Sequence, residues 1–431
     1  RSLRFGTHPA YIIPHVHGPR RFRGSILLTE AEFAMWKKPI TLTCTLLLLT
    51  VQALAGVKED IAAIARSGKV LVLDAEGNEL VAHNADGVFS PASVAKIVTA
   101  WLAMEVLGSD YRFKTSFYLD ENRVLYVRGG GDPFLVSEEF ALLAPQLLEA
   151  TGKEPFTGMV IDTSYFPDDL RIPGIEDDNE AYNALNVALA ANFNTINAVR
   201  KGKSVRSAEK QTPITPLAIA QFQARAPNGR SRISLAQEDP SIGALYAAEL
   251  IAAFVKEAGG SVEGEMAIGS LPPGLKPIYV HEQSRDLAEI LRQMMIGSNN
   301  YIANQVFLEV GAQSRGGQAS LEKSIQVADA IFAKHDIGDA IVLQEGSGIS
   351  PENRFTAQGL AKVLDAFSDH GELMKRTKAG SRYKTGSIDG VRTLAGYAVT
   401  KEHGIVRFVI SLGGNSGKTR FRVLRAIERG L

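Results

Sequence analysis

Two short apolar segments around a polar turn form the first regular pattern in the chain. Lys69 to Leu73 reads Lys-Val-Leu-Val-Leu and Glu79 to Ala82 reads Glu-Leu-Val-Ala, with Ala-Glu-Gly-Asn at 75–78 between them. Apolar runs of this length beside a turn that contains Gly and Asn are typical of a β-hairpin. A helix is predicted next, over Ser90 to Leu107, because a polar start passes into an apolar pattern that ends before Gly108.

The middle of the chain, from Tyr111 to about Ile278, has a different pattern. Short apolar segments such as Arg123 to Val127 alternate with turns such as Gly129 to Pro133. Gly and Pro end regular elements, so this alternation indicates many short strands. Helical spacing appears only at about 137–151 and 240–258, and we therefore expect a large, mostly β region.

Beyond residue 284 the apolar residues recur at helical spacing, and β-like segments and a basic helix follow. This order predicts one α/β (α+β) domain assembled from both chain ends, 57–110 and 279–431, with 111–278 as one or two inserted domains. The expected helices are Ser284–Ile296, Asn300–Val310, Gln318–Lys334, Thr356–Ser368 and Thr419–Arg429, and the expected β-like segments are 381–386, 391–399 and 404–412.

A separate apolar run near the start has the features of a secretory signal. Met35-Trp36-Lys37-Lys38 precedes the apolar run Pro39 to Val51, and Ala53-Leu54-Ala55 follows it. A basic segment, an apolar run of about a dozen residues and an A-x-A site are typical of a signal peptide, and a spanning helix needs roughly 20 apolar residues. We expect residues 35–55 to be a cleaved signal peptide; an uncleaved membrane anchor is the alternative.

Residues 1–34 precede that signal, and we interpret them as upstream, non-native sequence without a fold. His15 and His17 form a His-x-His pair there, which resembles a pair of metal ligands, but we exclude it with the segment. The whole chain has 47 basic and 47 acidic residues, which gives no support to nucleic-acid binding. Its single cysteine, Cys44, excludes a disulfide framework and a cysteine-based metal site.

The predicted helix at 90–107 carries the first candidate for chemistry, Ser93 and Lys96. A serine hydroxyl becomes a nucleophile when a neighbouring base takes its proton, and residues three apart on a helix lie on one face. The lysine must be neutral to act as that base, although its ordinary pKa is about 10.4. Ser-x-x-Lys also occurs at Ser207, Ser320 and Ser381, but only Ser93 opens a long apolar helix with suitable partners downstream.

Two further triplets follow this pair along the chain. Ser298-Asn299-Asn300 is the one Ser-x-Asn, and Lys384-Thr385-Gly386 is the one Lys-Thr-Gly. Each is a weak signal alone, since a Ser-x-Asn is more often a helix cap. The order Ser-x-x-Lys, Ser-x-Asn, Lys-Thr-Gly is the signature set of β-lactamases and penicillin-binding proteins.

Additional segments narrow the resemblance. The segments are 126–133 (Tyr-Val-Arg-Gly-Gly-Gly-Asp-Pro), 162–166 (Asp-Thr-Ser-Tyr-Phe), 182–194 and 345–350 (Glu-Gly-Ser-Gly-Ile-Ser). With the three motifs, roughly residues 57–431 resemble the class C penicillin-binding proteins, the D-alanyl-D-alanine carboxypeptidase/endopeptidase family with a large insertion between its first two motifs. The resemblance implies a β-lactamase/transpeptidase-like fold, an antiparallel sheet flanked by helices with a helical subdomain.

The resemblance also implies roles for the matching residues and no cofactor. Ser93 would be acylated with Lys96 as its base, and Ser298 and Asn300 would form the second motif. Lys384, Thr385 and Gly386 would form the third motif, in which Lys384 and Thr385 bind the substrate carboxylate and Gly386 lets the substrate backbone approach closely. The backbone N–H groups of Ser93 and Ser387 would form the oxyanion hole. Asp177 matches a position whose carboxylate reaches the diamino acid side chain of the substrate; a solvated acidic loop is the alternative.

The chain departs from the family pattern at three places. Glu345 stands where the family usually has Asp, the acidic stretch around Asp177 lacks a preceding tryptophan, and only about fifteen residues separate Ser368 from Lys384. The short segment opens one rim of the expected site and puts substrate preference in doubt more than chemistry.

The implied protein is a periplasmic serine D-Ala-D-Ala carboxypeptidase, with DD-endopeptidase as a second activity. Its partners would be peptidoglycan stem peptides and β-lactam antibiotics, with no nucleic acid and at most peripheral membrane contact. A serine β-lactamase is one alternative, although no Glu-x-x-x-Asn element for fast deacylation is evident. A non-catalytic wall-binding protein that keeps the fold is the other, and three intact motifs oppose it. The sequence does not predict the oligomeric state.

Overall fold

The computed structural model describes residues 56–235, 239–414 and 417–431. The expected signal peptide at 35–55, the upstream segment 1–34 and Cys44 lie outside the described residues. Within the described ranges, no helix has the length and apolar character needed to cross a membrane.

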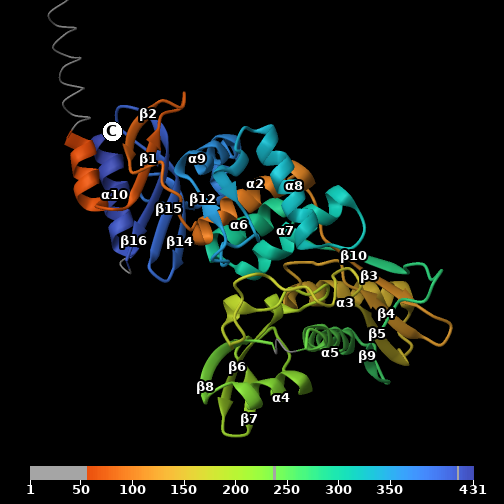
Figure 1. Ribbon diagram of the computed structural model, residues 1–431. Coiled ribbons are helices and arrows are strands. Elements are labelled where there is room, and N and C mark those ends of the chain that lie inside the picture. Colours follow the sequence, from red (N-terminus) through yellow and green to blue (C-terminus); the bar gives the residue numbers. More distant parts are fainter. Residues whose placement is uncertain (1–55, 236–238, 415–416) are drawn as a thin grey trace, which may run out of the picture. The chain divides into compact units, whose positions relative to one another are not determined.

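A six-stranded antiparallel sheet joins the two ends of the described chain, in the order β13-β14-β15-β16-β1-β2 (Figure 1). Residues 69–83 supply β1 and β2, and β1 pairs with β16, which comes more than 300 residues later, with Lys69 opposite Ser411. The strands are β1 (Lys69–Leu73), β2 (Glu79–His83), β13 (Lys375–Arg376), β14 (Arg382–Ile388), β15 (Val391–Val399) and β16 (Ile405–Gly413).

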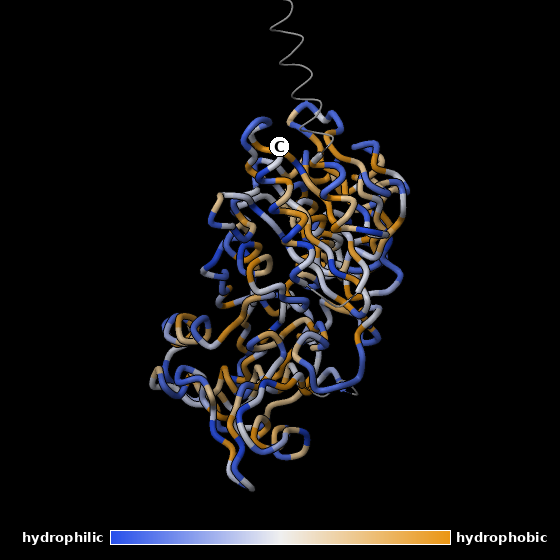
Figure 2. The backbone as a smooth tube through the Cα atoms, turned by 90° about the vertical axis from the view of Figure 1, so that its left-hand side faces the viewer, coloured by the Kyte–Doolittle hydropathy of each residue, from blue (hydrophilic) through white to orange (hydrophobic). Residues whose placement is uncertain are grey.

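Alternating side chains of this sheet enter two different cores. Val70 and Val72 of β1 pack with α10 (Gly417–Gly430) and a helix at 56–65, whereas Leu71 faces the larger helical core. A strand points successive side chains to opposite faces, so one apolar run covers both sides of the sheet. Figure 2 shows the apolar stretches gathered inside these layers and the hydrophilic ones on the outer loops.

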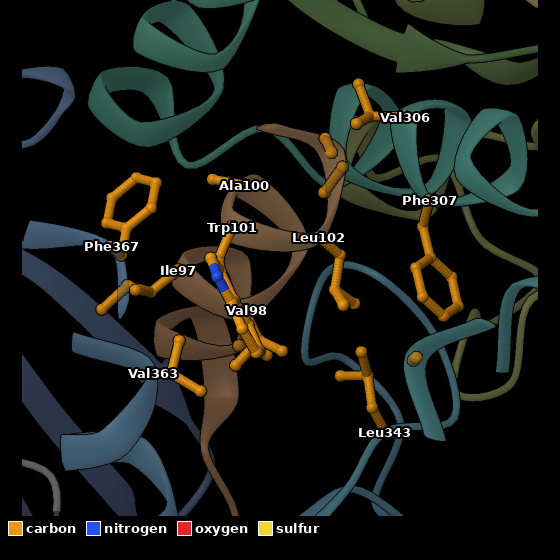
Figure 3. Close-up of a cluster of buried hydrophobic side chains, with 14 of the residues drawn as sticks. Ile97, Val98, Ala100, Trp101, Leu102, Val306, Phe307, Leu343, Val363 and Phe367 are labelled. Carbon is orange, nitrogen blue, oxygen red and sulfur yellow. The ribbon is translucent and has the colours of Figure 1, made fainter. Parts of the chain in front are cut away.

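Helix α2 (Ala95–Leu107) runs through the middle of the larger core (Figure 3). Its first nine residues are all buried, and they include Trp101, which stacks on Phe332. A helix that is apolar on every side belongs inside a protein rather than on its surface. The helices around it are α6 (Leu287–Gly297), α7 (Asn300–Arg315), α8 (Leu321–Lys334) and α9 (Ala357–Ala366), and the short β11 (Ile341–Val342) and β12 (Arg354–Phe355) pair beside them.

The region from Lys114 to Glu282 builds its own core from two smaller sheets and three α-helices. One sheet has the order β10-β3-β4-β5-β9 and the other β7-β6-β8. The elements are β3 (Lys114–Leu119), β4 (Val124–Arg128), α3 (Ser137–Thr151), β5 (Gly158–Asp162), β6 (Thr195–Lys201), β7 (Ser204–Ser207), α4 (Pro216–Arg225), β8 (Gly229–Ser234), α5 (Ser241–Glu257), β9 (Met266–Ile268) and β10 (Tyr279–Glu282).

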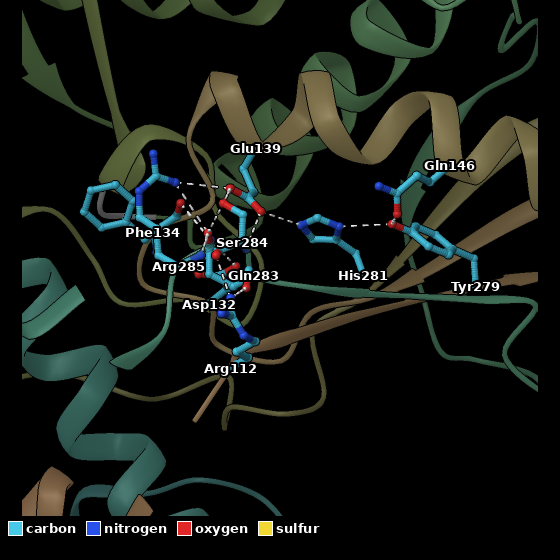
Figure 4. Close-up of polar contacts among 10 residues, drawn as sticks. All are labelled: Arg112, Asp132, Phe134, Glu139, Gln146, Tyr279, His281, Gln283, Ser284 and Arg285. Carbon is cyan, nitrogen blue, oxygen red and sulfur yellow. Dashed lines mark hydrogen bonds and ion pairs between the residues drawn. The ribbon is translucent and has the colours of Figure 1, made fainter. Parts of the chain in front are cut away.

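The chain enters and leaves this region at one place. Gln283 N donates to Phe113 O over 2.9 Å, and Arg112 Nη1 donates to Gln283 O over 2.8 Å. Beside this crossing the carboxylate of Glu139 accepts hydrogen bonds from Ser284 N and Oγ, and Arg285 Nη1 lies 3.2 Å from it (Figure 4). The two ends of a segment of roughly 170 residues are therefore fixed to each other.

Candidate active site

Ser93 and Lys96 lie at the start of α2. Ser93 is in a short 3₁₀ turn, Ala92–Val94, and Lys96 is in the first turn of the α-helix. Lys96 Nζ donates a hydrogen bond of 3.0 Å to Ser93 Oγ. The predicted contact between the pair is therefore present, although the backbone at Ser93 is a 3₁₀ turn rather than the α-helix that the sequence suggested.

Lys96 is held by three oxygen atoms in a fully buried position. Besides Ser93 Oγ, its Nζ donates to Asn300 Oδ1 and to Ser347 O, each over 2.7 Å. Burial lowers the pKa of Lys96 to about 7, and the charge of Glu345 opposes that shift. A lysine with such a pKa is partly neutral near pH 7, which a proton acceptor requires.

Ser298 and Asn300 occupy the connection between α6 and α7. Ser298 has left-handed backbone angles, φ 55° and ψ 37°, and ends α6. The Asn299 side chain then caps α7 by accepting from Ile302 N. This sharp reversal places Ser298 and Asn300 in the same cavity as Ser93.

Lys384 lies on strand β14, which reaches that cavity through Ser387. Its Nζ donates to Ser298 Oγ over 2.7 Å and to Thr385 O over 2.8 Å. Burial and the charge of Lys96 lower the pKa of Lys384 well below its ordinary value. The site therefore contains two hydrogen-bonded lysine–serine pairs, Lys96 with Ser93 and Lys384 with Ser298.

Gly386 lies where β14 passes the backbone of Ser93. A Cβ on Gly386 would stand 2.9 Å from Ser93 N, 2.8 Å from Pro91 O and 2.2 Å from Thr393 Oγ1. Contacts this short are not tolerated by a real Cβ, so only glycine permits the approach. Ser387, one residue on, lines the cavity with Ser93.

Two buried charged residues support the site, and the sequence did not reveal their roles. The Glu345 carboxylate accepts from Ser347 N and Gly348 N, each over 2.7 Å, and so shapes the loop whose Ser347 carbonyl contacts Lys96. Arg420 of α10 donates to Gly386 O over 2.5 Å and to Ser387 Oγ over 3.1 Å. Only the departure at Glu345 from the usual family residue marked it in the sequence.

The cavity has a volume of about 810 Å³. Glu176 and Tyr182 also line it, together with Asp389 from the β14–β15 turn. Asp177 is exposed, and the lining includes its neighbour Glu176 in its place. The acidic stretch around Asp177 thus reaches the cavity through a different carboxylate.

The three other Ser-x-x-Lys serines have structural contacts elsewhere. Ser207 Oγ donates to Glu209 O, Ser320 caps α8 by accepting from Lys323 N, and Ser381 Oγ donates to Glu428 Oε1. No cluster of His, Cys, Asp or Glu with metal-binding geometry occurs among the residues that the structure describes.

Comparison with known proteins gives relatives of one kind. The D-alanyl-D-alanine carboxypeptidase of Actinomadura sp. (strain R39) is 26% identical, and the match covers 87% of this chain and 84% of the relative. The crystal structure of penicillin binding protein 4 (dacB) from Haemophilus influenzae superposes with a TM-score of 0.68 at 21% identity, over 83% of this chain and 93% of the other. That protein has also been solved in complex with a β-lactam, with a TM-score of 0.64.

A more distant structure has the same fold. The predatory endopeptidase Bd0816 of Bdellovibrio bacteriovorus, solved with an immunity protein, matches with a TM-score of 0.51 at 19% identity, over 84% of this chain and 90% of the other. The family model described as "D-Ala-D-Ala carboxypeptidase 3 (S13) family" matches residues 50–236 and 226–379. Since these ranges span most of the sequence, the chain belongs to the D-Ala-D-Ala carboxypeptidase 3 (S13) family.

Proposed function

We propose that this protein is a serine-type D-Ala-D-Ala carboxypeptidase that acts on peptidoglycan stem peptides through an acyl-enzyme. One observation carries the proposal: Lys96 Nζ lies 3.0 Å from Ser93 Oγ while burial holds the pKa of Lys96 near 7. The hydroxyl thus has an adjacent base that is partly neutral under ordinary conditions. Family membership supplies the substrate class.

In the proposed reaction, Ser93 Oγ attacks the carbonyl carbon of the penultimate D-alanine and passes its proton to Lys96. The backbone N–H groups of Ser93 and Ser387 stabilise the oxyanion. The leaving amino group takes a proton through Ser298, whose Oγ accepts a hydrogen bond from Lys384 Nζ over 2.7 Å. Release of D-alanine leaves an ester on Ser93, and water hydrolyses it to restore the hydroxyl.

Lys384 and Thr385 would bind the terminal carboxylate of the substrate, and Asn300 would orient its peptide backbone. Asn300 Oδ1 already accepts from Lys96, and its Nδ2 donates to Tyr182 O over 3.2 Å. These contacts fix the amide, so it presents a defined face to the cavity. Asp177 remains a proposed contact for the diamino acid side chain, now shared with Glu176, which lines the cavity.

The proposal has further parts, which concern a second activity, β-lactam binding, location and domain bounds. We propose that the protein also cleaves D-alanyl crosslinks as a DD-endopeptidase, that β-lactams acylate Ser93, and that it works in the periplasm after removal of residues 35–55. We also propose residues 57–110 and 279–431 as the catalytic domain around an inserted region, 111–278. Strand β10 (Tyr279–Glu282) pairs with β3 and so belongs to the sheet of the inserted region. The chain leaves that region at Gln283, which hydrogen-bonds to Phe113.

The decisive experiment is labelling of the mature protein with a fluorescent penicillin, together with an assay for D-alanine released from a pentapeptide. Wild type should be labelled and should release D-alanine, and Ser93→Ala should lose both, by at least a thousandfold in rate. Ser207→Ala is the matched control, because Ser207 also precedes a lysine by three residues and contacts only Glu209. Labelling that persists in Ser93→Ala would overturn the proposal.

The same assay separates the alternatives. Loss of the label within seconds, without D-alanine release, would identify a β-lactamase. A folded wild-type protein that is neither labelled nor active would be a non-catalytic member of the family.

A further inference from the structure

A second cavity opens directly beside the active-site cavity. Its volume is about 440 Å³, and it shares Tyr182, Ser298 and Asn300 with the first. Whatever occupies it therefore contacts the same residues that hold the substrate. The proposed reaction makes no use of this space.

The lining of the second cavity is aromatic and uncharged. Phe134, Tyr182 and Phe193 supply rings, and Gln293 and Asn299 supply amides. Within the described part of the chain, no Asp, Glu, Lys or Arg lines it, whereas Glu176 and Asp389 line the first cavity. A charged group loses its hydration on entering such a site, so the lining favours a neutral ligand.

The backbone that presents Phe193 is strained. Asn192, Phe193 and Asn194 have consecutive φ values of 52°, 62° and 55°. Asparagine tolerates this left-handed region, but for phenylalanine it is unfavourable because Cβ comes too close to the following carbonyl oxygen. Strain of this kind persists where surrounding contacts impose it, and it is concentrated at functional sites.

Buried hydrogen bonds impose the strain. Asn192 Oδ1 accepts from Ser137 N over 3.0 Å, and Asn194 Nδ2 donates to Leu185 O over 2.9 Å. Both asparagine side chains are buried, whereas the Phe193 ring is half-buried and packs edge to face on Phe134, with 5.2 Å between centroids. The turn thus fixes one aromatic ring at the cavity wall.

We propose that this second cavity binds an uncharged N-acetylhexosamine ring of the glycan strand to which the stem peptide is attached. The inference rests on the proposed function for the substrate class. A pyranose ring presents an apolar C–H face to aromatic rings, and its hydroxyl and acetamido groups match amide donors and acceptors such as Gln293 and Asn299.

A second stem peptide fits the cavity less well than a sugar. Stem peptides carry ionised carboxylates, and no cation lines the cavity among the described residues. The acyl part of a stem peptide, four residues long, spans at most about 14 Å when extended. A sugar at its far end therefore remains close to the active-site cavity, and the second cavity adjoins the first through the shared residues Tyr182 and Asn300.

The test compares kcat/KM for D-alanine release from a free pentapeptide and from the same pentapeptide on its disaccharide. Wild type should prefer the disaccharide substrate by about tenfold, chiefly through KM, because the added contact is uniform binding. Phe193→Asn keeps a residue that accepts the left-handed turn and removes the ring, so the ratio should fall to about one. Ala181→Tyr, which fills the cavity from its lining, should do the same.

A binding measurement distinguishes failure of this inference from failure of the proposed function. Tri-N-acetylchitotriose, which contains no peptide, should show saturation-transfer NMR signals with Ser93→Ala protein, and the signals should disappear when Phe193→Asn is added. Penicillin labelling of Phe193→Asn in the active background checks its fold. Equal kcat/KM for the two substrates in wild type would overturn the inference, as would a gain seen only with a crosslinked, sugar-free peptide dimer.

Discussion

At the scale of single residues, Glu345 acts on both the position and the pKa of Lys96. Its carboxylate is fully buried and accepts hydrogen bonds from three backbone N–H groups, the hydroxyl of Ser347 and Asn353 Nδ2. The loop so formed presents Ser347 O to Lys96 Nζ. Because the negative charge also raises the pKa of Lys96, it limits how far burial can lower that pKa.

A pH profile tests this arrangement. Neutral Lys96 is the reactive form, so the rate of acylation by penicillin should rise with pH through about 7 and then level off. Glu345→Gln removes the charge that favours protonated Lys96, and the acidic limb of the profile should move to lower pH. Stopped-flow acylation between pH 5 and 9 measures both curves.

Glu352→Gln is the control for that experiment, since Glu352 follows on the same loop and is exposed. Its profile should coincide with that of wild type. An acidic limb that stays in place in Glu345→Gln, or moves to higher pH, would show that Glu345 acts on the loop alone.

The motif residues could be predicted because the residues of each motif lie within a few positions of one another in the sequence. Ser93 with Lys96, Ser298 with Asn300, and Lys384 with Thr385 each occupy one local segment. Arg420 could not be assigned in this way, because it donates to Gly386 O of β14 from α10. The hydrogen bonds of Glu345 are local, but Lys96, the residue that its loop contacts, lies about 250 positions earlier in the chain.

At the scale of elements, the close passage of β14 across the 3₁₀ turn at Ala92–Val94 aligns the third motif with the nucleophile. Thr393 Oγ1 of the neighbouring strand β15 donates to Pro91 O over 2.8 Å, which holds the turn against the sheet. Ala92 in this turn has φ 46°, a left-handed value that its neighbours must maintain. The position of Ser93 therefore depends on the sheet.

Gly386→Ala should separate these elements. The new Cβ would contact backbone atoms of Pro91 and Ser93 at less than 3.0 Å, so the turn or the strand must shift. We expect penicillin acylation to slow by at least a hundredfold, since a displacement of about 1 Å has this effect on a reacting group. Gly413→Ala, on β16 of the same sheet with open space around it, should leave the rate unchanged. Similar rates for the two variants would contradict the close approach.

Most elements of the C-terminal part could be predicted from periodicity, including α7, α8 and the strands β14 to β16. The central region was harder to predict, and helix α4 (Pro216–Arg225) was missed there. Its only buried side chains are Ala218 and Phe222, so its sequence lacks a broad apolar stripe. Thr215 at the N-cap and Pro216 at the first position are the start signals of α4 in the sequence.

At the scale of the whole described chain, Glu139 links α3 to the segment where the chain returns to the helical core (Figure 4). The His281 ring Nε2 lies 2.9 Å from its Oε1, and Ser284 and Arg285 contact the same carboxylate. This cluster was not predictable, because Glu139 and its partners are separated by more than 140 residues and belong to no motif.

Glu139→Ala should lower the free energy of unfolding by about 3–5 kcal/mol, because it removes a buried carboxylate and leaves His281 without its hydrogen-bond partner and Arg285 without its counter-charge. Glu138→Ala, one residue earlier on the exposed side of α3, should change it by less than about 0.5 kcal/mol. Urea unfolding followed by tryptophan fluorescence measures both. A loss below 1 kcal/mol in Glu139→Ala would mean that the crossing is held by its backbone hydrogen bonds alone.

The pairing of β1 with β16 also sets the order in which the protein can mature. The ribosome makes roughly 340 residues between Lys69 and its partner Ser411, which takes about 17 to 70 seconds at 5–20 residues per second. Until then the hairpin β1–β2 has an unpaired edge, and Ser93 lacks the strand that carries Lys384. A nascent chain cut short before β14 therefore contains the nucleophile but no finished site, and the peptidase stays inactive until β14 has been made.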